Sequence, residues 1–126
     1  MRRPYAHIRS SVDGSRAQKN GAGKGSGALW NNNADNPGKW PLVKADHPIG
    51  EWNTLRIRII GSKVWVWLND QQTVDAQILD NYFDRTKPIP ATGPIELQTH
   101  GSEIRFRNIY LREIPPAAVK DAGEKK

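Results

Sequence analysis

The sequence predicts an all-β protein of antiparallel strands, folded as a β-sandwich or jelly roll. Apolar and polar residues alternate through most of residues 52–114, and this is the period of a half-buried strand. Short turn sequences separate the alternating stretches. No stretch shows an apolar period of 3.6 residues over three helical turns, so no long helix is expected.

The first three predicted strands form a meander, and they span residues 52–60, 63–69 and 71–79. Gly61-Ser62 joins the first two strands and has glycine first, as a type II′ hairpin turn prefers. Asn69-Asp70 supplies the next turn. The chain is therefore expected to reverse twice within thirty residues.

Each strand of this meander has one apolar face. The apolar positions predicted to point inward in the first two strands are Leu55, Ile57, Ile59, Val64, Val66 and Leu68. Trp65 and Trp67 occupy the other face of the second strand, since successive side chains point to opposite sides.

Two further strands are predicted at residues 94–100 and 103–114, and residues 26–31 can form one more. The apolar phase of the last strand slips by one residue, which a bulge near Arg107-Asn108 would correct. Six one-faced strands need a second sheet to cover them. Because the first quarter of the chain is too polar to supply that sheet, we expect N-terminal strands of the domain to be missing.

Composition places the chain in the class of single domains. Its 126 residues include no cysteine, which excludes disulfides, thiolate zinc sites and a cysteine nucleophile. We predict a basic, Gly/Ser-rich N-terminal segment at residues 1–25, a partial domain at 26–114 and a disordered tail at 115–126.

The net charge of +6 lies in the ends of the chain. Residues 1–25 hold six basic residues and one acidic residue, and residues 26–114 are neutral. A nucleic-acid groove would place its cations in the folded body, so no nucleic-acid partner is expected.

The longest apolar run, "VWVWL", is too short to cross a bilayer. Arg2 and Arg3 are followed by no apolar stretch, so no signal peptide is visible and the localisation stays open. The alternatives are a cytoplasmic protein and one whose gene starts upstream, which would suit a periplasmic or secreted protein.

The segments "GEWNTLRIRIIGSKVWVWLNDQQTVD" and "GPIELQTHGSEIRFRNIYLREI" resemble the C-terminal part of the 3-keto-disaccharide hydrolase domain family. The resemblance covers residues 26–114. Its marks are Gly50-Glu51-Trp52-Asn53, Trp67-Leu68-Asn69, Ile95, Leu97-Gln98, His100-Gly101 and Phe106-Arg107-Asn108-Ile109. The chain departs from the family at Asp70, where a glycine is usual, and lacks the strands with which family domains begin.

The resemblance implies a concanavalin-like jelly roll that cleaves a glycoside whose C3 hydroxyl is oxidised to a ketone. The ketone acidifies the C2 proton, and its removal gives an enolate from which the C1 oxygen departs. Such a site needs a base near C2, a group that stabilises the enolate, and a proton for the leaving oxygen. A divalent metal is a possible cofactor for the second task.

The predicted strand at 94–100 sets Glu96, Gln98 and His100 on one face, about 6.6 Å apart in turn. We expect His100 to be the base or a metal ligand, and Glu96 to bind hydroxyls, ligate metal or protonate the leaving oxygen. Gln98 can both donate and accept hydrogen bonds. We expect these side chains to converge with other groups on a sugar cleft.

Two further pairs of side chains complete the predicted site. Arg105 or Arg107 would hold the enolate, and Trp65 and Trp67 offer flat surfaces for the C–H groups of a pyranose ring. His47, in a loop before a proline, is a further imidazole that can line the cleft. The expected partner is an oligosaccharide or other glycoside.

Plainer roles fit the same residues. His100 precedes Gly101 and can merely cap a strand, Glu96 can pair with a cross-strand arginine, and the two tryptophans can be core or interface residues. A non-catalytic sugar-binding module and an inactive domain fragment are therefore the alternatives to an enzyme.

Overall fold

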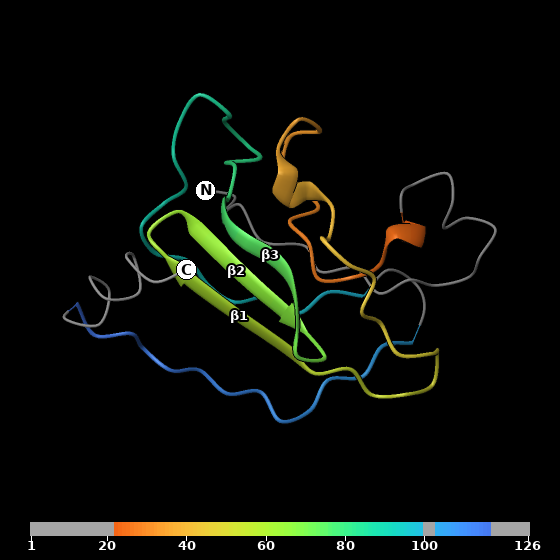
Figure 1. Ribbon diagram of the computed structural model, residues 1–126. Coiled ribbons are helices and arrows are strands. Elements are labelled where there is room, and N and C mark those ends of the chain that lie inside the picture. The colour runs from red at the N-terminus through yellow and green to blue at the C-terminus, as the bar shows by residue number, and fades with distance from the viewer. Residues whose placement is uncertain (1–21, 100–102, 117–126) are drawn as a thin grey trace. The chain divides into compact units, whose positions relative to one another are not determined.

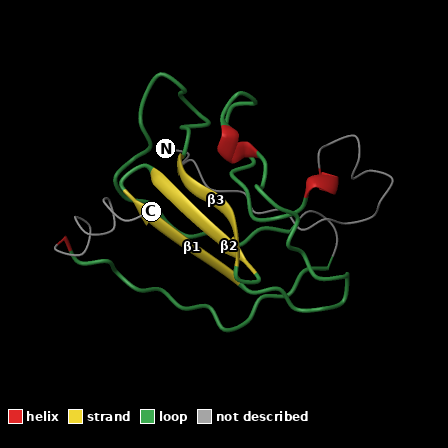
Figure 2. Ribbon diagram, viewed as in Figure 1, coloured by secondary structure: helices red, strands yellow, loops and turns green. Residues whose placement is uncertain are grey.

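A computed structural model of the protein describes residues 22–99 and 103–116 (Figure 1). Its elements are two three-residue 3-10 helices and three strands: η1 (Ala22–Lys24), η2 (Pro37–Lys39), β1 (Leu55–Ile60), β2 (Lys63–Leu68) and β3 (Gln71–Ile78). The strands form one antiparallel sheet in the order β1-β2-β3. With almost no helix beside this sheet, the described part is consistent with the all-β prediction (Figure 2).

Both predicted hairpin turns are present. Ile60 lies opposite Lys63, and Gly61 between them has φ +60°, as the first central residue of a type II′ turn requires. Asn69 and Asp70 have φ values of +50° and +63°. Two positive φ values in succession make the second link a type I′ turn.

The pairing of β3 with β2 slips twice, between Val64 and Val66 and between Val66 and Trp67. Beside the second slip, Thr73 is fully buried, and its hydroxyl donates to the Gly27 carbonyl at 2.6 Å. Gly27 has φ +83°, and an added Cβ would lie 2.9 Å from the threonine hydroxyl. The hydrogen bond from Thr73 thus holds the loop that contains Gly27 against the sheet.

The core lies over β2 and β3. It consists of Ala28, Leu29, Val64, Val66, Val74 and Leu79, with Ile89 packed against it. η2 also packs on β3. None of these residues belongs to β1. Accordingly Leu55, Ile57 and Ile59, which were predicted to point inward, keep 39%, 41% and 49% of their surface exposed.

Three predicted strands do not form in the described residues. Residues 26–31 make bends and turns, and neither 94–99 nor 103–114 is part of a sheet. The physical reason is that alternation specifies which face of a strand is apolar. It does not specify which other strand pairs with it through backbone hydrogen bonds. Asn108 does take φ +54°, a local irregularity at the predicted bulge position, although no ladder surrounds it.

The chain divides into two compact units, Met1–Pro94 and Ile95–Lys126. The three-stranded sheet and its core belong to the first. An opposing sheet, which a sandwich needs, is not present among the described residues. The predicted N-terminal segment and C-terminal tail lie largely outside those residues, and so does His100.

Candidate functional site

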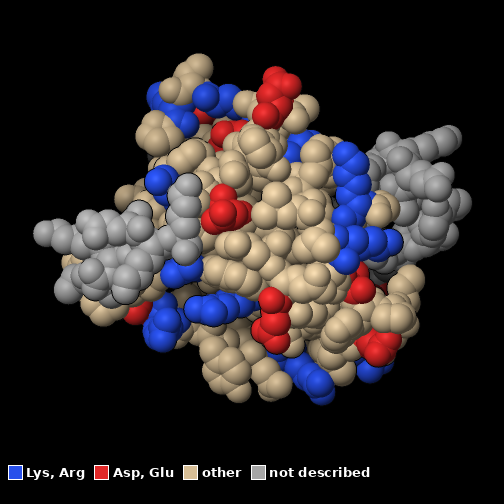
Figure 3. All heavy atoms as spheres, in the orientation of Figure 1, with Lys and Arg blue, Asp and Glu red and all other residues tan. Residues whose placement is uncertain are grey.

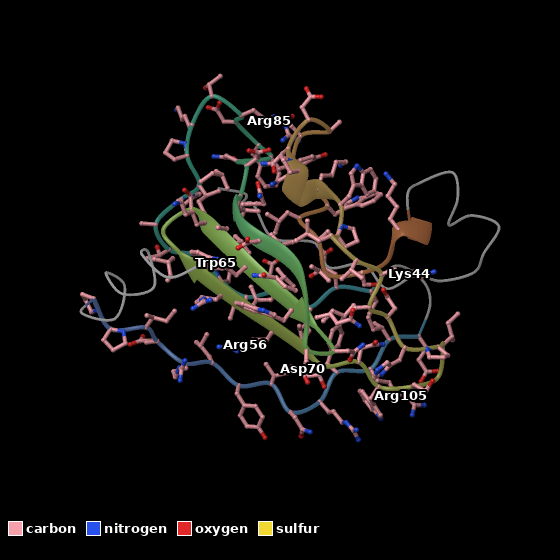
Figure 4. The ribbon with its side chains drawn as sticks, viewed as in Figure 1. Lys44, Arg56, Trp65, Asp70, Arg85 and Arg105 are labelled. Carbon is pink, nitrogen blue, oxygen red and sulfur yellow. The ribbon has the colours of Figure 1, made fainter. Side chains whose placement is uncertain are left out.

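The face of the hairpin opposite the core carries alternating arginines and tryptophans. Arg56 lies opposite Trp67, and Arg58 lies opposite Trp65, in the register of β1 and β2. We call these four residues the Arg–Trp face. Figure 4 labels one member from each strand, Arg56 and Trp65.

The guanidinium groups lie over the indole rings. The Arg56 guanidinium carbon is 4.9 Å from the centre of the Trp67 ring. That of Arg58 is 5.0 Å from the Trp65 ring and 5.1 Å from the Trp67 ring. Each such contact is worth about 0.5–1 kcal/mol, and more where water is excluded. The rings therefore hold both cations in fixed positions.

Neither guanidinium has an acidic partner in the described part of the chain. Among the described residues, Arg56 and Arg58 form no ion pair, and the Nε atom of Arg58 is buried without a hydrogen-bond partner. Arg56 is exposed and Arg58 half-buried. Two positive, planar groups on an aromatic floor are suited to oxygen-rich or anionic ligands.

The rings of this face are less open than predicted. Trp65 keeps only 6% of its surface exposed, and Trp67 is half-buried. The guanidinium groups lie over the rings. A ligand of the Arg–Trp face would therefore contact the cations and the edges of the indoles rather than two open ring surfaces.

Arg56 and Arg58 were missed in the sequence analysis, although the signal was available. A two-residue link at Gly61-Ser62 fixes the hairpin register, and that register sets each arginine opposite a tryptophan. Counting back from the turn would have found both pairs.

The predicted residues of the second unit are partly described. Glu96 is exposed and Gln98 half-buried, on a segment that forms no strand through residue 99. Arg105 and Arg107 are exposed, and Arg105 Nε donates to Glu103 Oε1 at 2.5 Å. Arg105 is thus paired with an acid two residues away. The sequence had predicted that Arg105 or Arg107 would hold the enolate of the substrate.

His47 is the histidine within the described residues. Its Nδ1 lies 2.9 Å from the Trp52 carbonyl, and its backbone N–H donates to Asn53 Oδ1 at 2.8 Å. Because a carbonyl only accepts, Nδ1 carries the proton, and Nε2 holds the lone pair of the neutral ring. This geometry makes His47 able to act as a base.

No three His, Asp or Glu side chains of the described residues come together as a metal site. The described set therefore does not fit a resident metal ion. Within the same residues, no helix is long and apolar enough to cross a membrane. Lys and Arg form separate groups on the face drawn in Figure 3, with acidic side chains among them.

The model of the 3-keto-alpha-glucoside-1,2-lyase-like domain family matches residues 4–112, which is most of the chain. The chain belongs to this family. The match confirms the resemblance found in the sequence. It is consistent with a carbohydrate-related domain. No curated protein and no solved structure is significantly similar to the chain.

Proposed function

We propose that this 3-keto-glucoside lyase-like domain binds a glycoside carrying a C3 ketone and cleaves its glycosidic bond by proton abstraction next to that ketone. The observation that carries the proposal is the Arg–Trp face. An enolate places negative charge on the sugar oxygen, and a fixed guanidinium stabilises charge that develops in the transition state. Membership of the family supports this choice of substrate class.

The chemistry proceeds in two stages. A base removes the C2 proton, and the electron pair moves onto the C3 oxygen as an enolate. The enolate then re-forms the ketone as the C1 oxygen leaves with a proton, which creates a C1–C2 double bond. Addition of water across that bond would make the net reaction a hydrolysis.

The roles of the side chains follow from this scheme. Within the first unit, Arg58 lies between two rings and is the proposed enolate partner, with Arg56 beside it. Arg105 and Arg107, in the second unit, are the candidates for this task that the sequence predicts. His100 is proposed as the base and Glu96 as the proton donor to the leaving oxygen, with Gln98 binding hydroxyls.

The direct test is turnover of a 3-keto-α-glucoside disaccharide by the purified chain. Arg58→Met removes the cation and keeps an apolar stem over the rings. We expect kcat/KM to fall by about a hundredfold, the usual cost of losing one donor to a developing oxyanion. Arg58→Lys should retain part of the activity, because charge persists without the planar fork.

Lys87→Met is the matched control. Lys87 is exposed and pairs loosely with Asp84 at 3.7 Å, so its loss should leave turnover unchanged. Full activity in Arg58→Met would remove the Arg–Trp face from the mechanism. Absence of both binding and turnover in the parent protein would overturn the function itself.

The base is assigned by comparing His100→Ala with His47→Ala. Loss of a general base lowers kcat by a factor of about 100 or more, whereas loss of a binding group raises KM. A fall in kcat confined to His47→Ala would transfer the role to the imidazole whose tautomer is fixed by Trp52.

A non-catalytic sugar-binding module is the second candidate. The observation in its favour is that the Arg–Trp face, as defined by its two arginines and two tryptophans, contacts a ligand through cations and rings and contains no general base. Binding of the keto-glycoside without turnover would establish that function.

A further inference from the structure

A second group of cations and indole rings lies in residues 24–40. Trp30 and Trp40 meet edge to face, with their ring centres 5.5 Å apart. Lys24 Nζ lies 4.3 Å from the centre of the Trp40 ring, and Lys39 Nζ lies 4.9 Å from Trp30 and 5.4 Å from Trp40. We call these four residues the Lys–Trp cluster.

The two ammonium groups contact the same ring, and neither has an acidic partner among the described residues. Lys39 Nζ donates to two carbonyls, those of Trp30 at 2.7 Å and Asn32 at 3.2 Å. Partial burial, and then the charge of Arg85, hold the pKa of Lys39 below its usual value. Within residues 22–99 and 103–116, the cluster is therefore positive and has no acidic side chain as a counter-charge.

We propose that the Lys–Trp cluster binds the carboxylate of an acidic sugar, a uronate residue of an oligosaccharide. The carboxylate would supply the missing negative charge to Lys24 and Lys39. The C–H groups of the pyranose ring would pack on the indoles, which offer apolar surface beside the cations. The proposal rests on the proposed function only in taking the ligand to be a carbohydrate.

The chemistry of the cluster favours an acidic sugar over a neutral one. A neutral sugar would leave two ammonium groups near one ring without compensation. A small inorganic anion would satisfy the charge but would not use the indole surface. An acidic sugar does both, so affinity should depend on the carboxylate and on the ring that carries it.

The test is calorimetric titration with tetragalacturonate and with its fully methyl-esterified form, which keeps the rings and removes the charge. We expect the ester to bind at least about tenfold more weakly, the effect of one charge-assisted hydrogen bond. Affinity for the acid should also fall as salt rises from 50 to 200 mM, since partly exposed charges are screened.

Lys24→Met is the informative variant, because Lys24 is exposed and its ammonium group lies over the Trp40 ring. We expect about a tenfold loss of tetragalacturonate affinity and recovery in Lys24→Arg. Lys63→Met removes an exposed lysine from β2 and serves as the matched control. Equal affinity of acid and ester, or no loss in Lys24→Met, would overturn the proposal.

Two further measurements separate this proposal from other outcomes. Competition by inorganic sulfate as strong as by the uronate would show a general anion site and overturn the sugar assignment. Arg58→Met should leave tetragalacturonate affinity unchanged. Turnover of the keto-glycoside can fail while acid-selective binding persists, so failures of the two proposals are distinguishable.

Discussion

Asn32 links two loops through its side chain. It is 1% exposed, its Nδ2 donates to the Ile78 carbonyl at 2.8 Å, and its Oδ1 accepts from the Asp80 N–H at 2.9 Å. The side chain thus pairs with backbone groups of Ile78 and Asp80 at the point where the strand pairing of β3 ends. Both of its polar ends are satisfied inside the protein. Its removal leaves the Asp80 N–H without its acceptor, whereas the Ile78 carbonyl keeps the Asn36 Nδ2 donor at 3.1 Å.

We predict that Asn32→Ala lowers the free energy of unfolding by about 1–3 kcal/mol. Asn33→Ala is the control, because the exposed Asn33 engages Asp80 only through its backbone N–H. Urea denaturation measures both variants. Equal stability of the two would mean that the loops are held by other contacts.

Asp84 gives a prediction about pH. The Thr86 hydroxyl donates to its Oδ1 at 2.6 Å, and this bond, followed by the Thr86 N–H, holds the pKa of Asp84 below 3.8. Thr86→Val should raise the pKa of Asp84 toward 3.8, as measured by NMR titration of its carboxyl carbon.

The sign of the stability effect follows from linkage. A depressed pKa in the folded state stabilises the protein above the unfolded value of 3.8, and this stabilisation is lost as pH falls through the folded pKa. The stability difference between the parent and Thr86→Val should therefore be present at neutral pH and shrink below about 3.8. A constant difference down to pH 2 would contradict this.

At the scale of elements, the two turns set the meander, and one of them carries strain. Asp70 is exposed and has φ +63°, in the left-handed region that glycine adopts at least cost. A side chain in this left-handed region costs about 0.5–1 kcal/mol even for the tolerant aspartate. We predict that Asp70→Gly raises the free energy of unfolding by about that amount.

Gly61→Ala is the opposite experiment. An added Cβ would meet no atom within 4 Å, so the cost comes from φ +60° alone. We expect a loss of about 1 kcal/mol in thermal or urea unfolding. An unchanged midpoint for both turn variants would show that the turns relax without penalty.

The meander was predictable from sequence because its signals are local. Turn residues, strand lengths and the faces of β2 all lie within residues 52–79. The register of the Arg–Trp face follows from the same turn. The register shifts of β3 were not predictable from local signals. They accompany the hydrogen bond between the Thr73 hydroxyl and the Gly27 carbonyl, which lies forty-six residues away in the sequence.

At the scale of the whole molecule, long-range pairing was beyond the sequence. Apolar and polar residues do alternate in 94–99 and 103–114. This alternation does not identify a partner strand, and these segments pair with no strand among the described residues. The row of Glu96, Gln98 and His100 depended on that strand. Their roles stay predictions, and His100 lies outside the described residues.

The core also predicts an order of stability across the sheet. β2 is bonded on both sides, and Val64 and Val66 are buried, whereas β1 has a described neighbour only on the side of β2. We expect amide hydrogens of β2 to exchange at least about tenfold more slowly than those of β1. Equal protection would reveal a further strand along β1.

The position of Arg56 and Arg58 on this outer strand has a consequence for solubility. An outer strand with half-exposed Leu55, Ile57 and Ile59 is a template for a second chain. If two copies of β1 met antiparallel around Ile57, each Arg56 would stand against an Arg58 of the other copy, and their repulsion would oppose the pairing. The same two cations that are proposed to recognise a sugar would thereby keep the protein from aggregating, and a double neutral variant should precipitate at concentrations where Arg58→Lys stays monomeric.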